Sequence, residues 1–209
     1  DSRLGGKSRA VADIGSHWMD MAEHITGKRI RALCASTAIF HPTRKKPLAP
    51  CATFSRPDGD MAYEDVVIDT EDYASILLEF EGGVQGCLTV SQMAAGRDNR
   101  CTLEVDGTDR SLCWNSEQPN DLLVGYRDRN NELLTRDPNR LSGYARQFTG
   151  CPGGHAEGYP DTVKYLLKQL YQAISEQQAG AAAVPADYAT FADGLHILRL
   201  CDAVLLSSR

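Results

Sequence analysis

The chain has 209 residues, 42% hydrophobic and 24% charged, which suffices for one well-buried core but not for two ordinary domains, so we expect a single domain over residues 1–209. A mean hydropathy of -0.35, without a long uncharged apolar run, predicts no transmembrane helix. The 28 acidic residues outnumber the 22 basic ones, and a net charge of -6 argues against nucleic acids and anionic membranes as partners.

The first periodic segment, residues 12–26, predicts a helix that ends at Gly27, because glycine readily adopts the left-handed conformation of a helix stop. Its predicted apolar side consists of Ile14, Trp18, Met21, Ala22 and Ile25. Residues 29–38 then alternate like a strand. Four prolines within residues 41–63 predict a long loop without regular structure, in which the basic run 44–46 is interpreted as a solvated turn.

From residue 71 to residue 135, short apolar runs of period two predict a meander of antiparallel strands. The runs are divided at residues 81–83, 106–108 and 128–131, each of which has the composition of a hairpin turn. The apolar residues suffice for a broad sheet, and helices at the two ends of the chain can cover one face of it but hardly both.

The last part of the chain predicts two helices after an irregular, glycine-rich stretch at residues 138–160. Apolar residues at helical spacing place them at 161–177 and 190–207. The order of elements, one helix, several antiparallel strands and two helices, is typical of the α+β class.

Seven cysteines without a C-x-x-C pair argue against both a disulfide framework and a thiolate zinc site. We expect each cysteine to act as a small buried apolar side chain in a reduced, cytoplasmic protein. The first residues lack the layout of a secretion signal, and the absence of an initial methionine suggests a fragment.

Four ionisable residues of the first helix, Asp13, His17, Asp20 and His24, fall along one stripe opposite its apolar side. A solvated helix face is one interpretation of this pattern. An Asp and a His one turn apart can also hold a substrate hydroxyl and relay its proton. Binding of a divalent metal is a weaker hypothesis, because the H-E-x-x-H spacing is missing, and we expect no metal.

The segment that contains this stripe resembles a motif of a known family. Glycines 5 and 6, followed by A-D-I-G-S-H-W-M-D at 12–20, are similar to the GG…D-I-G-S-H-x-x-D motif of the glucose-fructose oxidoreductase, inositol dehydrogenase and rhizopine-catabolism (Gfo/Idh/MocA) oxidoreductases. Further similarities are E-D at 71–72, F-E-G-G-V-Q-G at 80–86, G-G-H-A-E-G-Y at 153–159, A-D-G at 192–194 and S-S at 207–208.

The resemblance implies the C-terminal half of a two-domain enzyme that moves a hydride between NAD or NADP and a sugar, cyclitol or related hydroxyl compound. This half has a large, mostly antiparallel open sheet with helices on one face, and its sheet forms a homodimer or tetramer. The sequence has no G-x-G-x-x-G between a strand and a helix, and no E-K-P motif with the family's catalytic lysine. We therefore expect a fragment without the Rossmann domain, inactive alone, with the cofactor held mainly by the missing half.

By the family's pattern, His17 hydrogen-bonds the reacting hydroxyl and assists proton transfer, while Asp13 positions the substrate. Gly5 and Gly6 let the backbone approach the nicotinamide closely, although a plain loop turn explains them equally well. His155 and Tyr159, in the G-H-x-E-G-Y type of loop found in sugar-acting members, are predicted to contact the substrate. We expect His155 within about 10 Å of His17, a gap that one monosaccharide spans.

Two other functions remain open at this stage. A sugar-binding or assembly module without redox chemistry is the first, because a fold does not establish an activity. A metal-dependent hydrolase that uses Asp13, His17 and His24 is the second.

Overall fold

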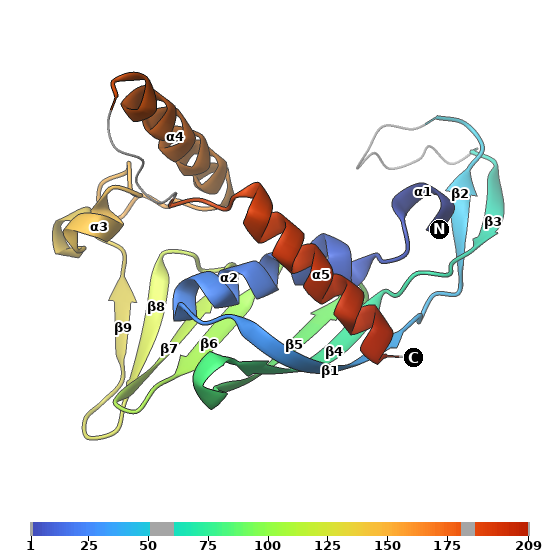
Figure 1. The fold of residues 1–209 in the computed structure, drawn as a ribbon, viewed down its shortest axis with the longest axis horizontal. Helices are drawn as coiled ribbons and strands as arrows, with labels where there is room; N and C mark the ends of the chain where they lie inside the picture. The colour runs from blue at the N-terminus through green and yellow to red at the C-terminus, as the bar shows by residue number, and fades with distance from the viewer. Residues whose placement is uncertain (1, 51–60, 181–186, 209) are drawn as a thin grey trace. The chain divides into compact units, whose positions relative to one another are not determined.

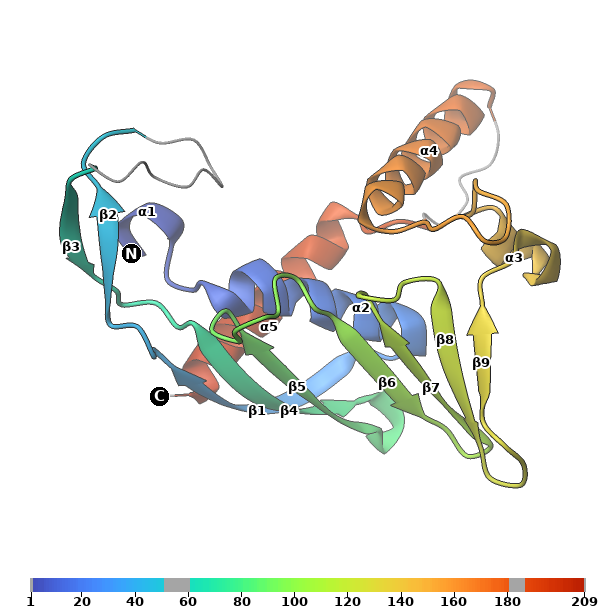
Figure 2. The same cartoon turned by 180° about the vertical axis from the view of Figure 1, so that it is seen from behind.

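The structure is a computed structural model that describes residues 2–50, 61–180 and 187–208. The chain divides into two compact units, and each is described by itself (Figures 1 and 2). Unit 1 combines residues 1–95 with residues 191–209, and unit 2 comprises residues 96–190. The expected single domain over residues 1–209 stays a prediction.

Unit 1 packs helices on one face of a three-stranded antiparallel sheet of order β1-β4-β5, and a separate hairpin pairs β2 with β3. Its helical elements are α1 (Ser2–Gly5), the π-helix η1 (Val11–Gly15), α2 (Ser16–Thr26), the 3-10 turn η2 (Glu81–Gly83) and α5 (Phe191–Ser207). Its strands are β1 (Ile30–Ala38), β2 (Thr43–Pro47), β3 (Tyr63–Val67), β4 (Tyr73–Phe80) and β5 (Gln85–Ser91).

The core of unit 1 follows from the alternation of β4, which buries every second side chain. Against this buried face pack apolar residues of η1, α2, β1, β5 and α5. The fully buried members of the cluster include Ile76, Leu78, Val11, Met19 and Val204. Burial of one such side chain contributes about 1.5–3 kcal/mol, so these contacts hold the helical layer on the sheet.

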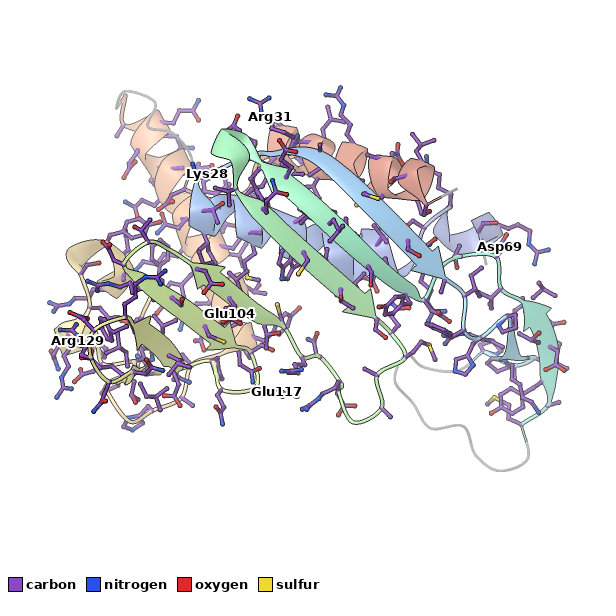
Figure 3. All side chains as sticks on the ribbon, turned by 90° about the horizontal axis from the view of Figure 1, so that it is seen from below. Lys28, Arg31, Asp69, Glu104, Glu117 and Arg129 are labelled. Carbon is purple, nitrogen blue, oxygen red and sulfur yellow. The ribbon has the colours of Figure 1, made fainter. Side chains whose placement is uncertain are left out.

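The opposite face of the β1-β4-β5 sheet is turned toward the viewer in Figure 3, with α2 and α5 behind the strands. Leu77 of β4 is 64% exposed there, and its neighbours across the strands are Cys34 and Cys87, both exposed. No described helix of unit 1 covers this face.

Unit 2 contains a four-stranded antiparallel meander followed by helices. Its strands, in the order in which they pair, are β6 (Thr102–Asp106), β7 (Arg110–Asn115), β8 (Asp121–Tyr126) and β9 (Glu132–Thr135). After them come the 3-10 turn η3 (Pro138–Arg140), α3 (Gly143–Arg146) and α4 (Tyr159–Gln178). Leu103 and Val124 are the buried apolar side chains of this sheet among the described residues.

The α+β class with antiparallel strands is confirmed, together with the three long helices, the first strand and all three hairpin turns. Gly27 ends α2 with a φ of 63°, as the sequence predicted. Gly82 and Gly83, at φ of 76° and 78°, form the turn between β4 and β5 in a backbone region that disfavours other residues.

Residues 41–63 correct the prediction of a long loop. Residues 43–47 form β2 and pair with β3, so the basic run is a strand rather than a solvated turn. Lys46 makes an ion pair of 2.8 Å with Glu64 across the hairpin. Pro47 is tolerated because it ends a strand in a two-stranded sheet, where a missing N–H disrupts no inner ladder. Residues 51–60 lie outside the described residues.

The single meander over 71–135 is also wrong. β4 and β5 pair with β1, which precedes them by more than 30 residues, whereas β6 to β9 form a sheet of their own. Local periodicity identifies strands but not their partners, because strand pairing depends on contacts between distant residues.

The cysteines differ in environment. The six described cysteines are free, and Cys201 is buried, where desolvation raises the pKa of its thiol to about 11. Cys34 and Cys87 are exposed, which contradicts the prediction that each cysteine is buried. Cys51 lies outside the described residues.

Candidate active site

The buried carboxylate of Glu71 holds the start of the first helical segment. Its Oε1 accepts hydrogen bonds from the hydroxyl of Ser8 at 2.7 Å and from the backbone N–H groups of Arg9 and Val11 at 2.9 Å each. These donors belong to the first turn of a helix, which otherwise lacks acceptors. Glu71 lies two residues before the start of β4, so the helix that carries Asp13 and His17 is fixed to the sheet at its beginning.

The predicted stripe lies on the solvent side of this helical segment. Asp13, His17 and His24 are exposed and Asp20 is half-buried. The buried residues of η1 and α2 lie on the other side: Val11, Gly15, Met19, Ala22 and Glu23. The structure thus confirms the exposure of the stripe, and a helix with π-type hydrogen bonding passes through Asp13, a feature often found at functional sites.

The apolar side of this helix was predicted only in part: Ala22 is buried and Trp18 packs against the core, but two other members are exposed. Ile14 and Ile25 are 42% and 51% exposed. The helix approaches the sheet at Gly15, where an added Cβ would lie 3.7 Å from Val90 Cγ1. A glycine contributes nothing to a count of apolar side chains, yet Gly15 is buried here, and the buried face is shifted by about one residue from the predicted one.

Asp13 has one side-chain partner among the described residues. Gln92, directly after β5, donates a hydrogen bond of 3.2 Å from Nε2 to Asp13 Oδ2. His17 makes no side-chain hydrogen bond to any described residue and projects from the first turn of α2. The two predicted residues are therefore accessible from the same side of one helical segment.

The other end of α2 is fixed by a charged network. Glu23 accepts hydrogen bonds from the N–H of Ile30 at 2.7 Å and from His196 Nε2 at 3.0 Å. It also forms an ion pair of 2.7 Å with Arg29. Burial alone raises the pKa of Glu23, but these hydrogen bonds outweigh it and the pKa is lowered, so the carboxylate is charged at neutral pH. Arg29 also forms an ion pair of 3.1 Å with Asp193 of α5, which extends the network to that helix.

Gly5 and Gly6 form an exposed turn ahead of this helix. Gly6 has a φ of 83° and donates its N–H to Ser2 O at 3.1 Å, which ends α1. A Cβ at either position would meet no atom within 4 Å. The turn therefore requires glycine at Gly6 for its backbone angle, and the backbone of both residues is open to a ligand.

The second predicted site is the loop that carries His155. It lies in unit 2 and is fixed by a buried ion pair. Arg136 and Glu157 form an ion pair of 2.8 Å, with side chains only 13% and 7% exposed. Glu157 Oε1 also accepts the N–H groups of Gly150 at 2.7 Å and Cys151 at 3.2 Å.

The same arginine holds the backbone of the loop itself. Arg136 donates to the carbonyl of Cys151 at 3.0 Å, to the carbonyl of His155, and from Nε to Asn120 Oδ1 at 2.8 Å. Asn120 in turn donates to the carbonyl of Glu157 at 3.0 Å. The backbone around His155 is thus fixed at several points.

His155 itself is exposed, and Tyr159, the first residue of α4, is 76% exposed. Both side chains are therefore free to meet a ligand on the surface of unit 2. They belong to a different unit from Asp13 and His17, and the predicted distance of about 10 Å between His155 and His17 stays a prediction.

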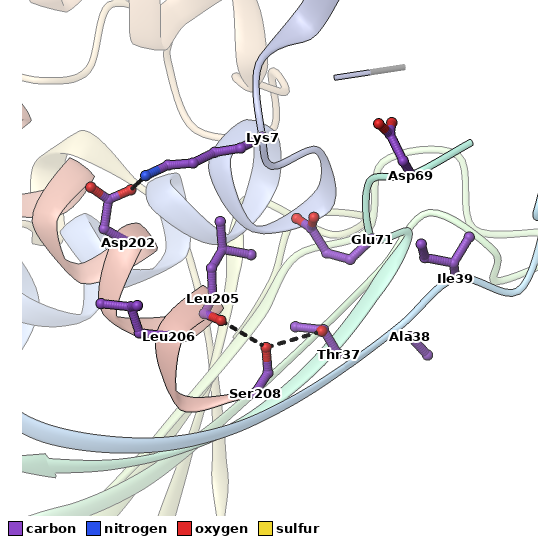
Figure 4. A pocket seen from close by; sticks show the side chains of 10 residues that line it. All are labelled: Lys7, Thr37, Ala38, Ile39, Asp69, Glu71, Asp202, Leu205, Leu206 and Ser208. Atoms are coloured by element: carbon purple, nitrogen blue, oxygen red, sulfur yellow. Dashed lines mark hydrogen bonds and ion pairs between the residues drawn. The ribbon is translucent and has the colours of Figure 1, made fainter. Parts of the chain in front are cut away.

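An open cavity of about 430 Å³ in unit 1 lies elsewhere and contains none of the predicted site residues (Figure 4). At its rim, Lys7 Nζ and Asp202 Oδ1 form an ion pair of 2.8 Å. Ser208 closes one end by hydrogen bonds to Thr37 and to the carbonyl of Leu205. Ser207 Oγ also accepts the N–H of Ala35 in β1 at 3.0 Å, so Ser207 and Ser208 attach the end of α5 to β1 and are structural here.

Neither a metal centre nor a membrane span is found in the described part of the chain. No group of three or more His, Cys, Asp or Glu residues there is arranged to hold a metal ion. This includes the stripe of η1 and α2, so the alternative of a metal-dependent hydrolase has no support among these residues. None of the described helices is long and apolar enough to cross a membrane.

The chain is similar to a known protein family and to several of its members. Residues 2–113, more than half of the chain, match the family model described as GFO/IDH/MocA C-terminal domain. The chain belongs to the GFO/IDH/MocA family. The resemblance in the motif around Asp13 and His17 is thereby confirmed at the level of the family.

Individual GFO/IDH/MocA proteins are similar over nearly the whole chain. Levoglucosan dehydrogenase of Pseudarthrobacter phenanthrenivorans is 24% identical over 96% of this chain and 50% of its own length. An inositol dehydrogenase homolog from Azotobacter vinelandii, solved with NAD+, is 25% identical with a TM-score of 0.79, over 100% of this chain and 48% of that one. A levoglucosan dehydrogenase solved with NADH and L-sorbose is 25% identical with a TM-score of 0.76, over 100% and 50%. The chain spans about half the length of these relatives.

Several residues that shape the site were not found from the sequence. Gln92 follows a strand and carries no motif, so only the contact to Asp13 reveals it. Asn120 lies in the turn between β7 and β8 and Arg136 directly follows β9, and nothing in their spacing connects them to His155. Glu157 was part of the quoted loop motif, but its role as the buried partner of Arg136 required the structure.

Proposed function

We propose that this chain is the substrate-binding and catalytic half of an NAD(P)-dependent oxidoreductase that acts on a hydroxyl group of a sugar, a cyclitol or a related compound. The observation that carries the proposal is the placement of Asp13 and His17 together on an exposed helical face of a GFO/IDH/MocA domain. The two solved relatives, an inositol dehydrogenase homolog with NAD+ and a levoglucosan dehydrogenase with NADH and L-sorbose, support this class of substrate.

In this reaction, His17 accepts a hydrogen bond from the substrate hydroxyl and assists removal of its proton. Imidazole suits this role because its ordinary pKa lies close to neutral pH. The Asp13 carboxylate accepts a hydrogen bond from the substrate and orients it, since an ionised carboxylate is an acceptor only. Glu71 and Glu23 hold the two ends of the helical segment, which keeps both groups in place.

The described residues fit only one end of a dinucleotide. Each pair of described strands is antiparallel, and none leads through a glycine-rich turn into a helix that would hold a pyrophosphate. Gly5 and Gly6 present an open backbone and suit contact with the nicotinamide end. When bound, the nicotinamide supplies or accepts the hydride, and this chain manages the substrate and its proton.

His155 and Tyr159 provide a second set of substrate contacts. Imidazole can donate to one sugar oxygen and accept from another, and a tyrosine ring can pack against the apolar face of a sugar. His155→Ala is expected to raise the KM of the intact enzyme about tenfold, because the fixed loop presents the side chain at no further ordering cost. Steady-state kinetics measures this, and an unchanged KM and kcat would remove His155 from the substrate site.

The uncovered face of the β1-β4-β5 sheet supports assembly into a homodimer or tetramer. A row of Cys34, Leu77 and Cys87 crosses its three strands, flanked by small side chains such as Ser75 and Thr89. Such a flat face excludes water best against a second sheet. Light scattering of the wild type should show an oligomer and Leu77→Lys should shift it toward monomer. A wild type that stays monomeric at high concentration contradicts the proposal.

The function itself is tested by assaying the intact enzyme with NAD+ and NADP+ against cyclitols and sugars, including myo-inositol and levoglucosan. Substrate-dependent formation of reduced nicotinamide is expected. Residues 1–209 alone should show no saturable micromolar binding of NADH by calorimetry, because the pyrophosphate site lies elsewhere. Sugar binding by the intact protein without any oxidation would instead identify a non-catalytic binding module.

A further inference from the structure

Gln92 lies beside the candidate catalytic helix for a structural reason. Side chains alternate along β5, so Val90 is buried against the helical layer, Ser91 points away from it, and Gln92 points toward it again. Val90 lies next to Gly15 in the π-helix, and the N–H of Gln92 is tied at 2.9 Å to the carbonyl of Asp72. The end of β5 is therefore fixed directly against the segment that contains Asp13.

The amide of Gln92 is oriented by its charged neighbour. A carboxylate only accepts hydrogen bonds, so the amide must turn Nε2 toward Asp13 Oδ2, to which it donates at 3.2 Å. This orientation leaves Oε1 buried and without a hydrogen-bond partner among the described residues. A buried acceptor without a partner destabilises the folded state.

This cost distinguishes a functional side chain from a structural one. An apolar side chain of similar size would fill the same space without burying an unpartnered oxygen. The one described side-chain contact that the amide gains is the hydrogen bond to Asp13, an exposed carboxylate that has no other side-chain partner among the described residues. The amide thus lowers the stability of the fold while it restricts one site residue.

We propose that Gln92 is a positioning residue that holds the Asp13 carboxylate in one orientation, with Oδ1 directed to the substrate hydroxyl. The proposal rests on the role of Asp13 in the proposed function. Gln92 does not touch the reacting atoms; it acts through Asp13. Misplacement of an orienting group by about 1 Å can cost up to a hundredfold in rate, so the loss of this hydrogen bond should be visible in turnover.

The test compares Gln92→Leu and the isosteric Gln92→Met in the intact enzyme. Both should lower kcat about tenfold and change KM less than threefold, while the melting temperature stays the same or rises because the unpartnered oxygen is gone. Gln169→Leu is the matched control, since Gln169 of α4 also buries an amide atom without a partner among the described residues. It should leave kcat unchanged.

The double variant Gln92→Leu/Asp13→Asn decides whether Gln92 acts through Asp13. If it does, the double variant has the kcat of Asp13→Asn alone, within about twofold. Independent, multiplicative losses would overturn the proposal, as would a normal kcat in both Gln92 variants when Asp13→Asn is impaired. A normal kcat in Asp13→Asn removes the role of Asp13 itself, and the proposal falls with it. Lower melting temperatures in both Gln92 variants would identify a merely structural side chain.

Discussion

Replacement of His17 by alanine is expected to lower kcat of the intact enzyme by about a hundredfold or more and to leave the fold unchanged. A positioned acid-base group contributes about 10² to 10⁴ in rate. His17 lies one helical turn from Asp13 on the same exposed face. The side chain is exposed and makes no hydrogen bond to a described side chain, so its removal costs the fold little. Initial rates and thermal unfolding, measured on the same preparation, separate the two effects.

His24→Ala is the matched control for this prediction. His24 is exposed on the same helix, in its last turn, and has no proposed part in the reaction. It should retain nearly full activity, whereas Asp13→Asn should be impaired less severely than His17→Ala. Equal activity of the His17 and His24 variants would return the stripe to a solvated helix face.

The elements of this fold could be predicted wherever the signal is local. The three long helices are visible in their periodicity, and the turn at residues 81–83 in its paired glycines. What the sequence could not provide is long-range pairing: β1 joins β4 and β5, although nothing in residues 30–38 identifies those partners. The hairpin of β2 and β3 was missed for a related reason, since Pro47 lies at a position that a peripheral strand tolerates.

The candidate site divides in the same way. Asp13 and His17 were found because a motif and a helical repeat coincide in one segment of ten residues. The groups that hold them are distant in sequence: along the chain, Glu71 comes before β4 and Gln92 comes after β5. Their polar side chains would be expected at the surface, and only the fold brings their oxygen and nitrogen atoms to the start of the helix.

The largest loss of stability is expected from Arg136→Met in unit 2. The substitution keeps an apolar stem of similar length but leaves Glu157, which is 7% exposed at its side chain, with only the half-exposed Lys164 at 3.8 Å as a cation. Removal of one partner from a buried ion pair costs about 3–5 kcal/mol, and because Lys164 compensates part of the remaining charge, we expect the lower end of this range. Urea unfolding of the intact enzyme, followed by a probe in unit 2, measures this change in the free energy of unfolding.

Arg136→Met/Glu157→Gln removes the uncompensated charge and separates this cause from the loss of the loop contacts. The glutamine carbonyl can still accept the N–H groups of Gly150 and Cys151, so the double variant should recover at least half of the lost stability. It should not recover the KM, because Arg136 also holds the carbonyls of Cys151 and His155 that fix the loop. A double variant less stable than Arg136→Met alone would mean that the charge on Glu157 is stabilised by its remaining neighbours. A KM equal to that of the wild type would mean that the loop keeps His155 in place without the arginine.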